Sequence, residues 1–310
     1  MEITVNLIRA IREKTGAGMT SCKKALVECN GNFDEAVDWL RKKGLAAASQ
    51  KASRVAIDGL IGVASNGYSS AAMVEVNTET DFVAKNQKFQ SFVFDVTVHC
   101  SISDITSIDQ LLNEKIGDVS IRDRTNDLIS VLGENIGIRR IVRLDVKTGV
   151  VASYIHNTAA ARVGKIGVLV SIESTADRPK LIEFGKKLAM HIAASNPKYL
   201  NIDSVPSVEL EHEKSILLEQ IRDSNRPTDV VNKMIEGRIR KFYEEVVLTE
   251  QTYVIDGKKN VAEVVNDFSE EVGVPVKVST FEKFVVGEGI EKINTDFAAE
   301  VQSLAGGCKC

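Results

Sequence analysis

One stretch organises the chain: Glu75-Val76-Asn77-Thr78-Glu79-Thr80-Asp81-Phe82-Val83-Ala84-Lys85-Asn86. It follows a strand-like run, Ala71 to Val76, and precedes a helix-like run that begins near Lys88. The tetrapeptide Thr80-Asp81-Phe82-Val83 is therefore predicted at a strand-to-helix junction. Function tends to be placed at such junctions because a rigid scaffold holds them.

The pairing of an acid with a large aromatic ring leaves two interpretations of this junction open. The side chain of Asp81 can cap the helix that follows. Turn chemistry does not explain Phe82 unless its ring folds back into the core. The first interpretation is a capped helix with a buried Phe. The second is a projecting wedge, which offers a carboxylate and a ring to a partner.

Composition limits the class of protein. The length of 310 residues predicts two or three domains. The hydrophobic share of 44% and the charged share of 26% are those of a soluble globular protein. The net charge of −4 argues against a nucleic-acid partner, because phosphate contacts need a surplus of Lys and Arg. No stretch approaches the roughly 20 apolar residues of a membrane span.

Two further features bear on the compartment. The N-terminus, Met1-Glu2-Ile3-Thr4, has neither the basic nor the apolar region of a secretory signal. The five cysteines are odd in number and widely scattered, which favours a reducing, cytoplasmic setting.

Residues 1–54 are predicted to form three short amphipathic helices. Gly16-Ala17-Gly18 separates the first two, and Lys42-Lys43-Gly44 ends the third, before a helical connector from Leu45 to Arg54. The second helix has apolar residues at i, i+3, i+4 and i+7: Cys22, Ala25, Leu26 and Cys29. Such a bundle resembles a ubiquitin-associated domain. Its core is small, so we expect it to dock on a partner.

The middle of the chain indicates an internal duplication and an α+β fold. Two hairpin-then-helix units are predicted, the first with strands Ala56 to Val63 and Ala71 to Val76, the second with strands Val150 to His156 and Lys165 to Ile172. Each unit is predicted to pack a helix on an antiparallel sheet. The expected core subdomains are 55–146, and 147–200 together with 244–284.

A helical hairpin is predicted over 201–243, with its turn at Asn225-Arg226-Pro227. Its narrow apolar seam and charged flanks favour an antiparallel coiled coil. Tyr253-Val254-Ile255 is predicted as a strand, Asn260 and Glu263 as a helix cap, and Val276 to Val286 as a last strand. Residues 285–310 are predicted to be a C-terminal helical module.

Motifs of catalysis are missing from the sequence. It contains no phosphate loop and no H-E-x-x-H, and its lone G-x-G pairs are typical of turns. Ser21-Cys22-Lys23-Lys24 matches S-x-x-K without the companion motifs of the penicillin-binding enzymes. Cys308-Lys309-Cys310 is too close and isolated for a zinc site. We therefore predict a binding protein that is not an enzyme and needs no cofactor.

The sequence resembles the elongation factor Ts family. The likeness is carried by Thr15-Gly16-Ala17-Gly18-Met19 with Cys22-Lys23-Lys24-Ala25-Leu26, by Glu75-Val76-Asn77 with Thr80-Asp81-Phe82-Val83-Ala84, and by Gly287 to Lys292 with Thr295 to Val301. The resemblance covers nearly the whole chain and implies a guanine nucleotide exchange factor. Its implied partner is elongation factor Tu, with no direct contact to nucleic acid or membrane.

The resemblance also implies roles for individual residues. Thr80, Asp81, Phe82 and Val83 would displace Mg²⁺ from the partner, and the helices around Gly16, Met19, Lys23 and Lys24 would bind its G domain. His156 would contact another domain, or simply cap a turn. Two departures stand out: Asn157 to Gly164 is predicted to be a longer loop than the family has, and Gly306 to Cys310 matches no family role. The second Thr-Asp-Phe, from Thr295 to Phe297, is predicted to pack within a helix.

Two other functions compete with exchange. The chain could be an adaptor that binds a partner peptide through its N-terminal bundle. It could also be a hydrolase that pairs Asp81 with a histidine, which requires the structure to bring the two together.

Overall fold

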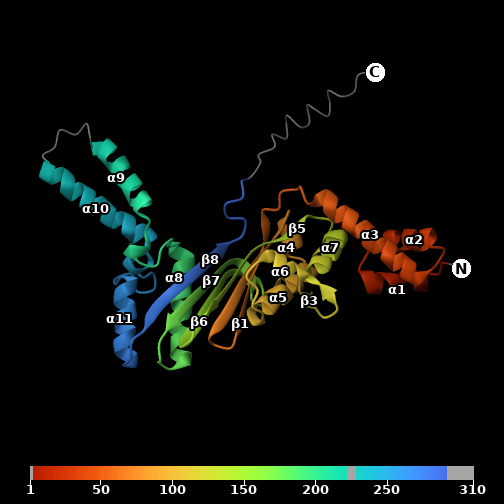
Figure 1. The fold of residues 1–310 in the computed structure, drawn as a ribbon, viewed down its shortest axis with the longest axis horizontal. Coiled ribbons are helices and arrows are strands. Elements are labelled where there is room, and N and C mark those ends of the chain that lie inside the picture. The colour runs from red at the N-terminus through yellow and green to blue at the C-terminus, as the bar shows by residue number, and fades with distance from the viewer. Residues whose placement is uncertain (1–2, 222–227, 292–310) are drawn as a thin grey trace, which may run out of the picture.

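The fold is mixed α+β, as predicted, in a computed structural model that describes residues 3–221 and 228–291 (Figure 1). A central sheet carries a helical bundle near the N-terminus at one end and a pair of helices at the other. Within the described ranges, no helix is both long and apolar enough to cross a bilayer.

The central sheet has six strands in the order β5-β2-β1-β7-β6, with β8 also paired to β7. Its strands are β1 (Asp58–Asn66), β2 (Ser70–Thr78), β5 (Ile136–Asp145), β6 (Gly149–Ala160), β7 (Val163–Glu173) and β8 (Lys277–Val285). Every pairing is antiparallel, and both predicted hairpins are present, as β1–β2 and β6–β7. The two units share this sheet because β1 pairs with β7 at Ile61↔Gly164 and Gly62↔Val163.

Apolar side chains that alternate between the two faces of the strands form three hydrophobic clusters with the neighbouring elements. On β1, Leu60 packs in a cluster with the helix of the first unit, whereas its neighbour Ile61 packs in a cluster between the two units. On β7, Val168 faces the helices of the second unit, whereas Leu169 joins the central cluster. Successive side chains of a strand point to opposite faces, so both faces of these strands are buried.

The first unit is covered by α5 (Gln87–Ile102), which begins at the cap residue Asn86. The helix expected in this unit is present, and its face of Phe89, Phe92, Val93 and Val96 is buried against β1 and β2. Beside it lie α6 (Ile108–Asn113), the short pair β3 (Lys115–Ile116) and β4 (Val119–Ser120), and α7 (Ile121–Leu132).

The second unit is covered by α8 (Arg178–Ser195) and α11 (Val261–Val272). Phe184 of α8 stacks on Phe268 of α11 with ring centroids 4.2 Å apart. The predicted cap of α11 is confirmed as a capping box, in which Asn260 and Glu263 each bind the other's backbone N–H.

The three predicted N-terminal helices are α1 (Val5–Thr15), α2 (Met19–Glu28) and α3 (Phe33–Lys51), and they share a small core. The predicted end at Lys42-Lys43-Gly44 is wrong, since α3 continues to Lys51. Packing against α7 explains the difference. Arg41 pairs with Asp123 at 2.7 Å, and Gly44 lies so close to Ser130 that a Cβ there would be 3.3 Å from its side chain.

The predicted helical hairpin corresponds to α9 (Ser207–Ile221) and α10 (Thr228–Val246), which lie side by side. Its turn at Asn225-Arg226-Pro227, the second Thr-Asp-Phe and the tail from Gly306 to Cys310 fall outside the described residues. The strand predicted at Tyr253-Val254-Ile255 is wrong. The N–H of Gly257 donates to the carbonyl of Tyr253 at 2.8 Å and closes a turn there.

His191 joins α8 to this turn. Its side chain is fully buried, and its Nδ1 accepts a hydrogen bond from the Val254 N–H at 3.3 Å. Its Nε2 therefore carries the proton and donates to Oε1 of Gln251 at 3.1 Å. Burial lowers the pKa of His191, and the neighbouring Tyr253 phenol, with its pKa raised by burial to about 12, stays neutral.

We expect this histidine to make the fold weaken in mild acid. Because its pKa is lowered by folding, its contribution is complete above the unfolded value of about 6.5 and is lost as pH falls below it. Urea unfolding should show a loss of up to about 1 kcal/mol between pH 6.5 and 5.5 that His191→Gln lacks. His212→Gln, at an exposed site on α9, should keep the wild-type pH dependence. An unchanged dependence in His191→Gln would contradict the assignment.

Candidate functional site

The central candidate is the short helix α4 (Asp81–Ala84), which follows β2 directly. The backbone of Thr80 is extended with φ −130° and forms the N-cap. Val83 and Ala84 are buried in the cluster under α5, whereas the side chain of Phe82 is 80% exposed. The interpretation with a buried Phe is therefore wrong, because Val83 and Ala84 occupy the inward positions.

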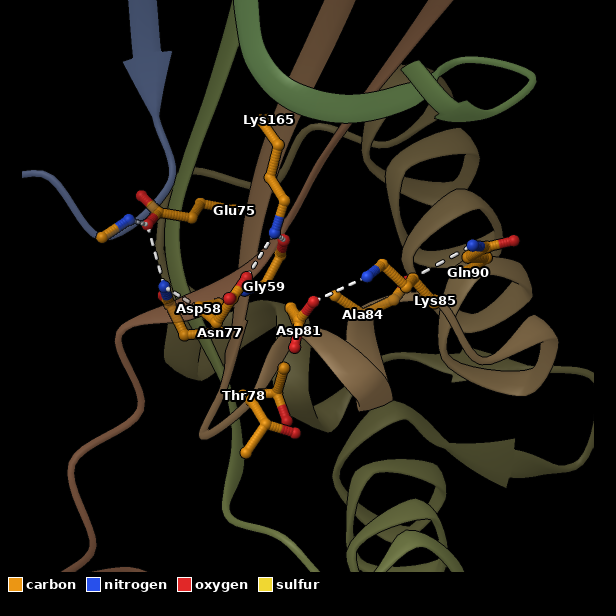
Figure 2. A network of polar contacts seen from close by, with 12 residues as sticks. Asp58, Gly59, Glu75, Asn77, Thr78, Asp81, Ala84, Lys85, Gln90 and Lys165 are labelled. Carbon is orange, nitrogen blue, oxygen red and sulfur yellow. Dashed lines mark hydrogen bonds and ion pairs between the residues drawn. The ribbon is translucent and has the colours of Figure 1, made fainter. Parts of the chain in front are cut away.

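The role expected for Asp81 as a helix cap is also wrong. Its carboxylate accepts a hydrogen bond from Nζ of Lys85 at 2.6 Å, one turn along the chain, and the two side chains point toward each other in Figure 2. Asn86 caps α5 instead, since its Oδ1 accepts from the Lys88 N–H at 2.9 Å. The hydrogen bond from Lys85 lowers the pKa of Asp81, so a half-exposed carboxylate stays charged at neutral pH.

A loop between α7 and β5 holds the start of α4. The Glu134 carboxylate accepts hydrogen bonds from the Thr80 N–H at 2.9 Å, the Thr80 hydroxyl at 2.5 Å and the Thr78 hydroxyl at 2.8 Å. In return, the Glu79 carboxylate accepts from the Asn135 N–H at 2.6 Å. We call these reciprocal contacts of Glu79 and Thr80 with Glu134 and Asn135 the loop clamp.

A fully buried carboxylate lies upstream on β2. Glu75 accepts hydrogen bonds from Arg139 at 3.2 Å, from Arg140 at 2.5 Å and from the Asn77 amide at 3.0 Å. A fourth donor is the N–H of Gly287 at 2.9 Å, in the turn after β8. Gly287 has φ +73°, and a Cβ there would lie 2.3 Å from the carbonyl oxygen of Ile57. Glu75 thus ties the first unit to the end of the last strand.

A cleft of about 510 Å³ lies beside this region. It is lined by Ile57, Asp58, Glu79, Asn157, Lys165, Ile166, Val285 and Val286. Lys165 of β7 reaches Asp58 and the carbonyl of Gly59 at its wall (Figure 2). The cleft therefore connects the strand that leads to α4 with the far end of the β6–β7 hairpin.

The N-terminal candidates lie on the separate bundle of α1–α3. Gly16 ends α1 with φ +68° and faces Lys88 and Val131 of the core. Met19, Lys23 and Lys24 are exposed on α2. Val27 is also 54% exposed and follows Met19 and Lys23 at spacings of four, which places the three on one face of the helix. The sequence interpretation did not single out Val27.

His156 lies within β6, paired with Ile166, and its exposed ring contacts the Tyr154 hydroxyl through Nδ1 at 3.1 Å. The loop predicted from Asn157 to Gly164 is wrong. The strands continue, with Thr158↔Gly164 and Ala160↔Val163 paired past a bulge, so the hairpin simply extends.

The residues that a hydrolase needs are not brought together. Asp81 bonds to Lys85 and His156 to Tyr154, so neither orients the other. Over residues 3–221 and 228–291, no group of three or more His, Cys, Asp and Glu side chains is placed to hold a metal ion.

Sequence reasoning missed Glu134 and Asn135. In the sequence, the run Gly133-Glu134-Asn135-Ile136-Gly137 indicates only a break between elements. The sequence signal for Glu134 is an acidic residue directly after a glycine that can end a helix. In the structure, Gly133 does end α7, with φ +82°. A loop acid has no periodicity, so its partners cannot be found without the fold.

Comparison with known proteins identifies the class. A family model described as "Elongation factor TS" matches residues 79–288. Elongation factor Ts of Rhodospirillum centenum is 48% identical over 307 residues, which cover 98% of this chain and 99% of the relative. Elongation factor Ts of Paramagnetospirillum magneticum is 49% identical, covering 98% of each. That of Brucella anthropi is 46% identical, covering 99% of this chain and all of the relative.

These matches define a translation elongation factor. The chain belongs to the elongation factor Ts family, which confirms the resemblance found in its motifs.

We expect Glu75→Gln to destabilise the fold by about 3 kcal/mol, because removing one member of a buried ionic cluster leaves the others uncompensated. The control is Glu288→Gln, which alters a carboxylate that is 48% exposed and 3.5 Å from the same Arg140. That change should cost less than about 1 kcal/mol. Urea unfolding at pH 7 measures both. Equal losses of stability in the two variants would show that burial does not determine how much Glu75 contributes to the free energy of unfolding.

Proposed function

We propose that the protein is a guanine nucleotide exchange factor that binds elongation factor Tu carrying GDP and promotes release of the GDP. Family membership supports the general role. The observation that carries the particular mechanism is the side chain of Phe82, 80% exposed on a helix whose neighbours Val83 and Ala84 are buried. A ring held outward on a fixed base can fill an apolar site of a partner.

An exchange factor of this kind works by linkage and forms no covalent bond. It binds the nucleotide-free partner more tightly than the GDP-bound form. By thermodynamic reciprocity, it then weakens GDP binding by the same factor by which GDP weakens its own binding. The proposed partner is therefore elongation factor Tu in both its GDP-bound and its nucleotide-free state.

Phe82 and Asp81 have separate parts in this mechanism. In GTPases, Mg²⁺ and backbone amides hold the phosphates, and Mg²⁺ demands a nearly ideal octahedral geometry. Phe82 inserts into the partner as a wedge and moves the elements that support the ion. Asp81 brings a negative charge or a competing acceptor to the Mg²⁺ network, while Thr80 and Val83 fix the two ends of the wedge. The lowered pKa of Asp81 supports a charged carboxylate in this role.

Two further surfaces are proposed to bind the same partner. Met19, Lys23 and Lys24 on α2 would meet its G domain, with the turn at Gly16 setting the direction of that helix. His156 on the extended β6–β7 hairpin would contact a second domain. The cleft that runs from Glu79 to Asn157 supports a continuous surface between the wedge and this hairpin.

We also propose the finer domain division. Residues 1–54 form a ubiquitin-associated-like bundle, which their own hydrophobic core supports. Residues 55–146, and 147–200 with 244–284, form two core subdomains, supported by two separate helix-on-sheet clusters. Residues 201–243 form a coiled-coil hairpin, supported by the contact of α9 with α10. The C-terminal module proposed for residues 285–310 lies mostly outside the described residues.

The proposed place of action is the cytoplasm, without direct contact to nucleic acid or membrane. The net charge of −4 supports this part of the proposal, because nucleic acids and anionic membrane surfaces both attract basic proteins.

The wedge can be tested by stopped-flow release of a fluorescent GDP analogue from elongation factor Tu. We expect wild type to accelerate release strongly and Phe82→Ala to slow the accelerated rate by about tenfold or more, the loss typical of a central apolar contact. The matched control is Ile102→Ala, which truncates another exposed apolar side chain, 62% exposed at the end of α5. It should behave as wild type.

Three outcomes would contradict this part of the proposal. No acceleration by wild type would exclude exchange and favour the adaptor. Equal losses in Phe82→Ala and Ile102→Ala would exclude a specific wedge. A loss of stability in Phe82→Ala beyond about 0.5 kcal/mol would show that the ring is structural, since exposed substitutions normally stay within that limit.

The role of Asp81 predicts a dependence on Mg²⁺. Asp81→Asn keeps the size of the side chain and removes its charge. It should slow GDP release at millimolar Mg²⁺ and have a smaller effect once Mg²⁺ is chelated, because the ion it acts on is then absent. The measurement is the same stopped-flow assay over a Mg²⁺ series. A defect of equal size with and without Mg²⁺ would disconnect Asp81 from the ion.

A further inference from the structure

We propose that Glu134 is a positioning residue for exchange: its carboxylate holds the Thr80 turn so that Phe82 is presented in one orientation. The role of Glu134 in exchange rests on the proposed function. Its role in holding the turn rests only on the hydrogen bonds of the loop clamp.

The helix that carries Phe82 cannot hold itself. It spans only four residues, Asp81–Ala84, and a single turn fixes more backbone dihedrals than its few hydrogen bonds repay. Its closing contacts are few: the Ala84 N–H lies 3.4 Å from the Thr80 carbonyl, the Lys85 N–H 3.0 Å from that of Asp81, and the Asn86 N–H 2.9 Å from that of Val83. External contacts must therefore set its direction.

The inward side of α4 fixes its depth without fixing its rotation. Val83 and Ala84 are buried in the cluster beneath α5, and apolar packing is not directional. The other support close to Phe82 is polar. Lys85 bonds Asp81 from within the same segment, and Gln90 of α5 donates to the Ala84 carbonyl at 3.3 Å. The start of α4 is held at Thr80, two residues before Phe82. There the side chain makes no capping bond to α4, and its hydroxyl donates to Glu134.

Glu134 meets the turn with both carboxylate oxygens. Oε2 accepts from the Thr80 N–H and the Thr78 hydroxyl, and Oε1 accepts from the Thr80 hydroxyl. Hydrogen bonds to an ionised acceptor are shorter and stronger than neutral ones, and two oxygens on one residue also fix its orientation. The end of β2 and the cap of α4 are thereby held to the same loop.

The loop itself is fixed from two directions. The Asn135 N–H donates to Glu79 at 2.6 Å, and the Asn135 amide donates to the Arg54 carbonyl at 2.7 Å. Gly133 ends α7 on one side of Glu134, and β5 begins at Ile136 on the other. Glu134 therefore transmits the position of the rigid α7–β5 junction to the base of the wedge. Preorganising a binding group in this way lowers the conformational entropy lost when it binds.

The variants are Glu134→Ala, which removes both acceptor oxygens and all three hydrogen bonds, and Glu134→Gln, which keeps one oxygen and the shape. The matched control is Glu263→Gln on α11, where the carboxylate also accepts a backbone N–H, from Asn260 at 3.0 Å. Each variant is made in the full chain. Glu134→Gln also serves if Glu134→Ala does not fold.

The first measurement is amide hydrogen exchange of the free protein at Thr80. We expect exchange to be about tenfold faster or more in Glu134→Ala, intermediate in Glu134→Gln and unchanged in Glu263→Gln, because loss of the acceptor lets the turn open locally. Unchanged protection at Thr80 in Glu134→Ala overturns the proposal.

The second measurement is GDP release from elongation factor Tu at increasing concentrations of each variant. Positioning predicts that the rate at saturation falls about tenfold in Glu134→Ala while the half-saturating concentration stays within about twofold, since the other docking surfaces are intact. A saturating rate equal to wild type, despite faster amide exchange, overturns the role in exchange. If wild type itself does not accelerate release, the proposed function fails, and amide exchange still decides whether Glu134 holds the turn.

Discussion

The buried carboxylate of Glu75 is the interaction on which the architecture depends. It lies on β2, in the middle of the first unit, and its donors come from β5, from β2 itself and from the turn after β8. A buried charge is costly unless its hydrogen-bonding capacity is met, so these elements must all be in place together. The first unit therefore does not complete its own core, and the chain closes on itself through Gly287.

The proposed wedge follows the same strand, on α4, a few residues downstream. From Glu75 the chain runs to the end of β2 at Thr78, whose hydroxyl donates to Glu134, and then to the cap residue Thr80. Buried charge fixes one end of this segment and half-buried hydrogen bonds fix the other, while Phe82 beyond them is exposed. The segment thus changes from fully buried to almost fully exposed within eight residues. This contrast gives a small helix the rigidity to present one ring.

The predictions that the structure confirms depend on interactions between residues close together in the chain. The capping box at Asn260 and the β1–β2 hairpin involve residues close together in the chain, and both are present. The features that the sequence did not predict depend on contacts between residues far apart in the chain. The shared sheet depends on Ile61 pairing with Gly164, and α3 continues past Gly44 because α7 packs there. The junction at Thr80 was predictable from its neighbours, whereas Glu134, 54 residues away, was not.

The closure through Gly287 has a consequence for synthesis of the chain. Gly287 lies 212 residues after the carboxylate to which it donates. At ~5–20 residues per second, the ribosome needs about 10 to 40 s to make that interval. Throughout this time Glu75 lacks one of its donors, and β7, once made, has no β8 beside it until residues 277–285 follow. The nascent first unit therefore leaves the ribosome unfinished, and a chain that stops before β8 begins at Lys277 exposes an open edge of β7 to its neighbours.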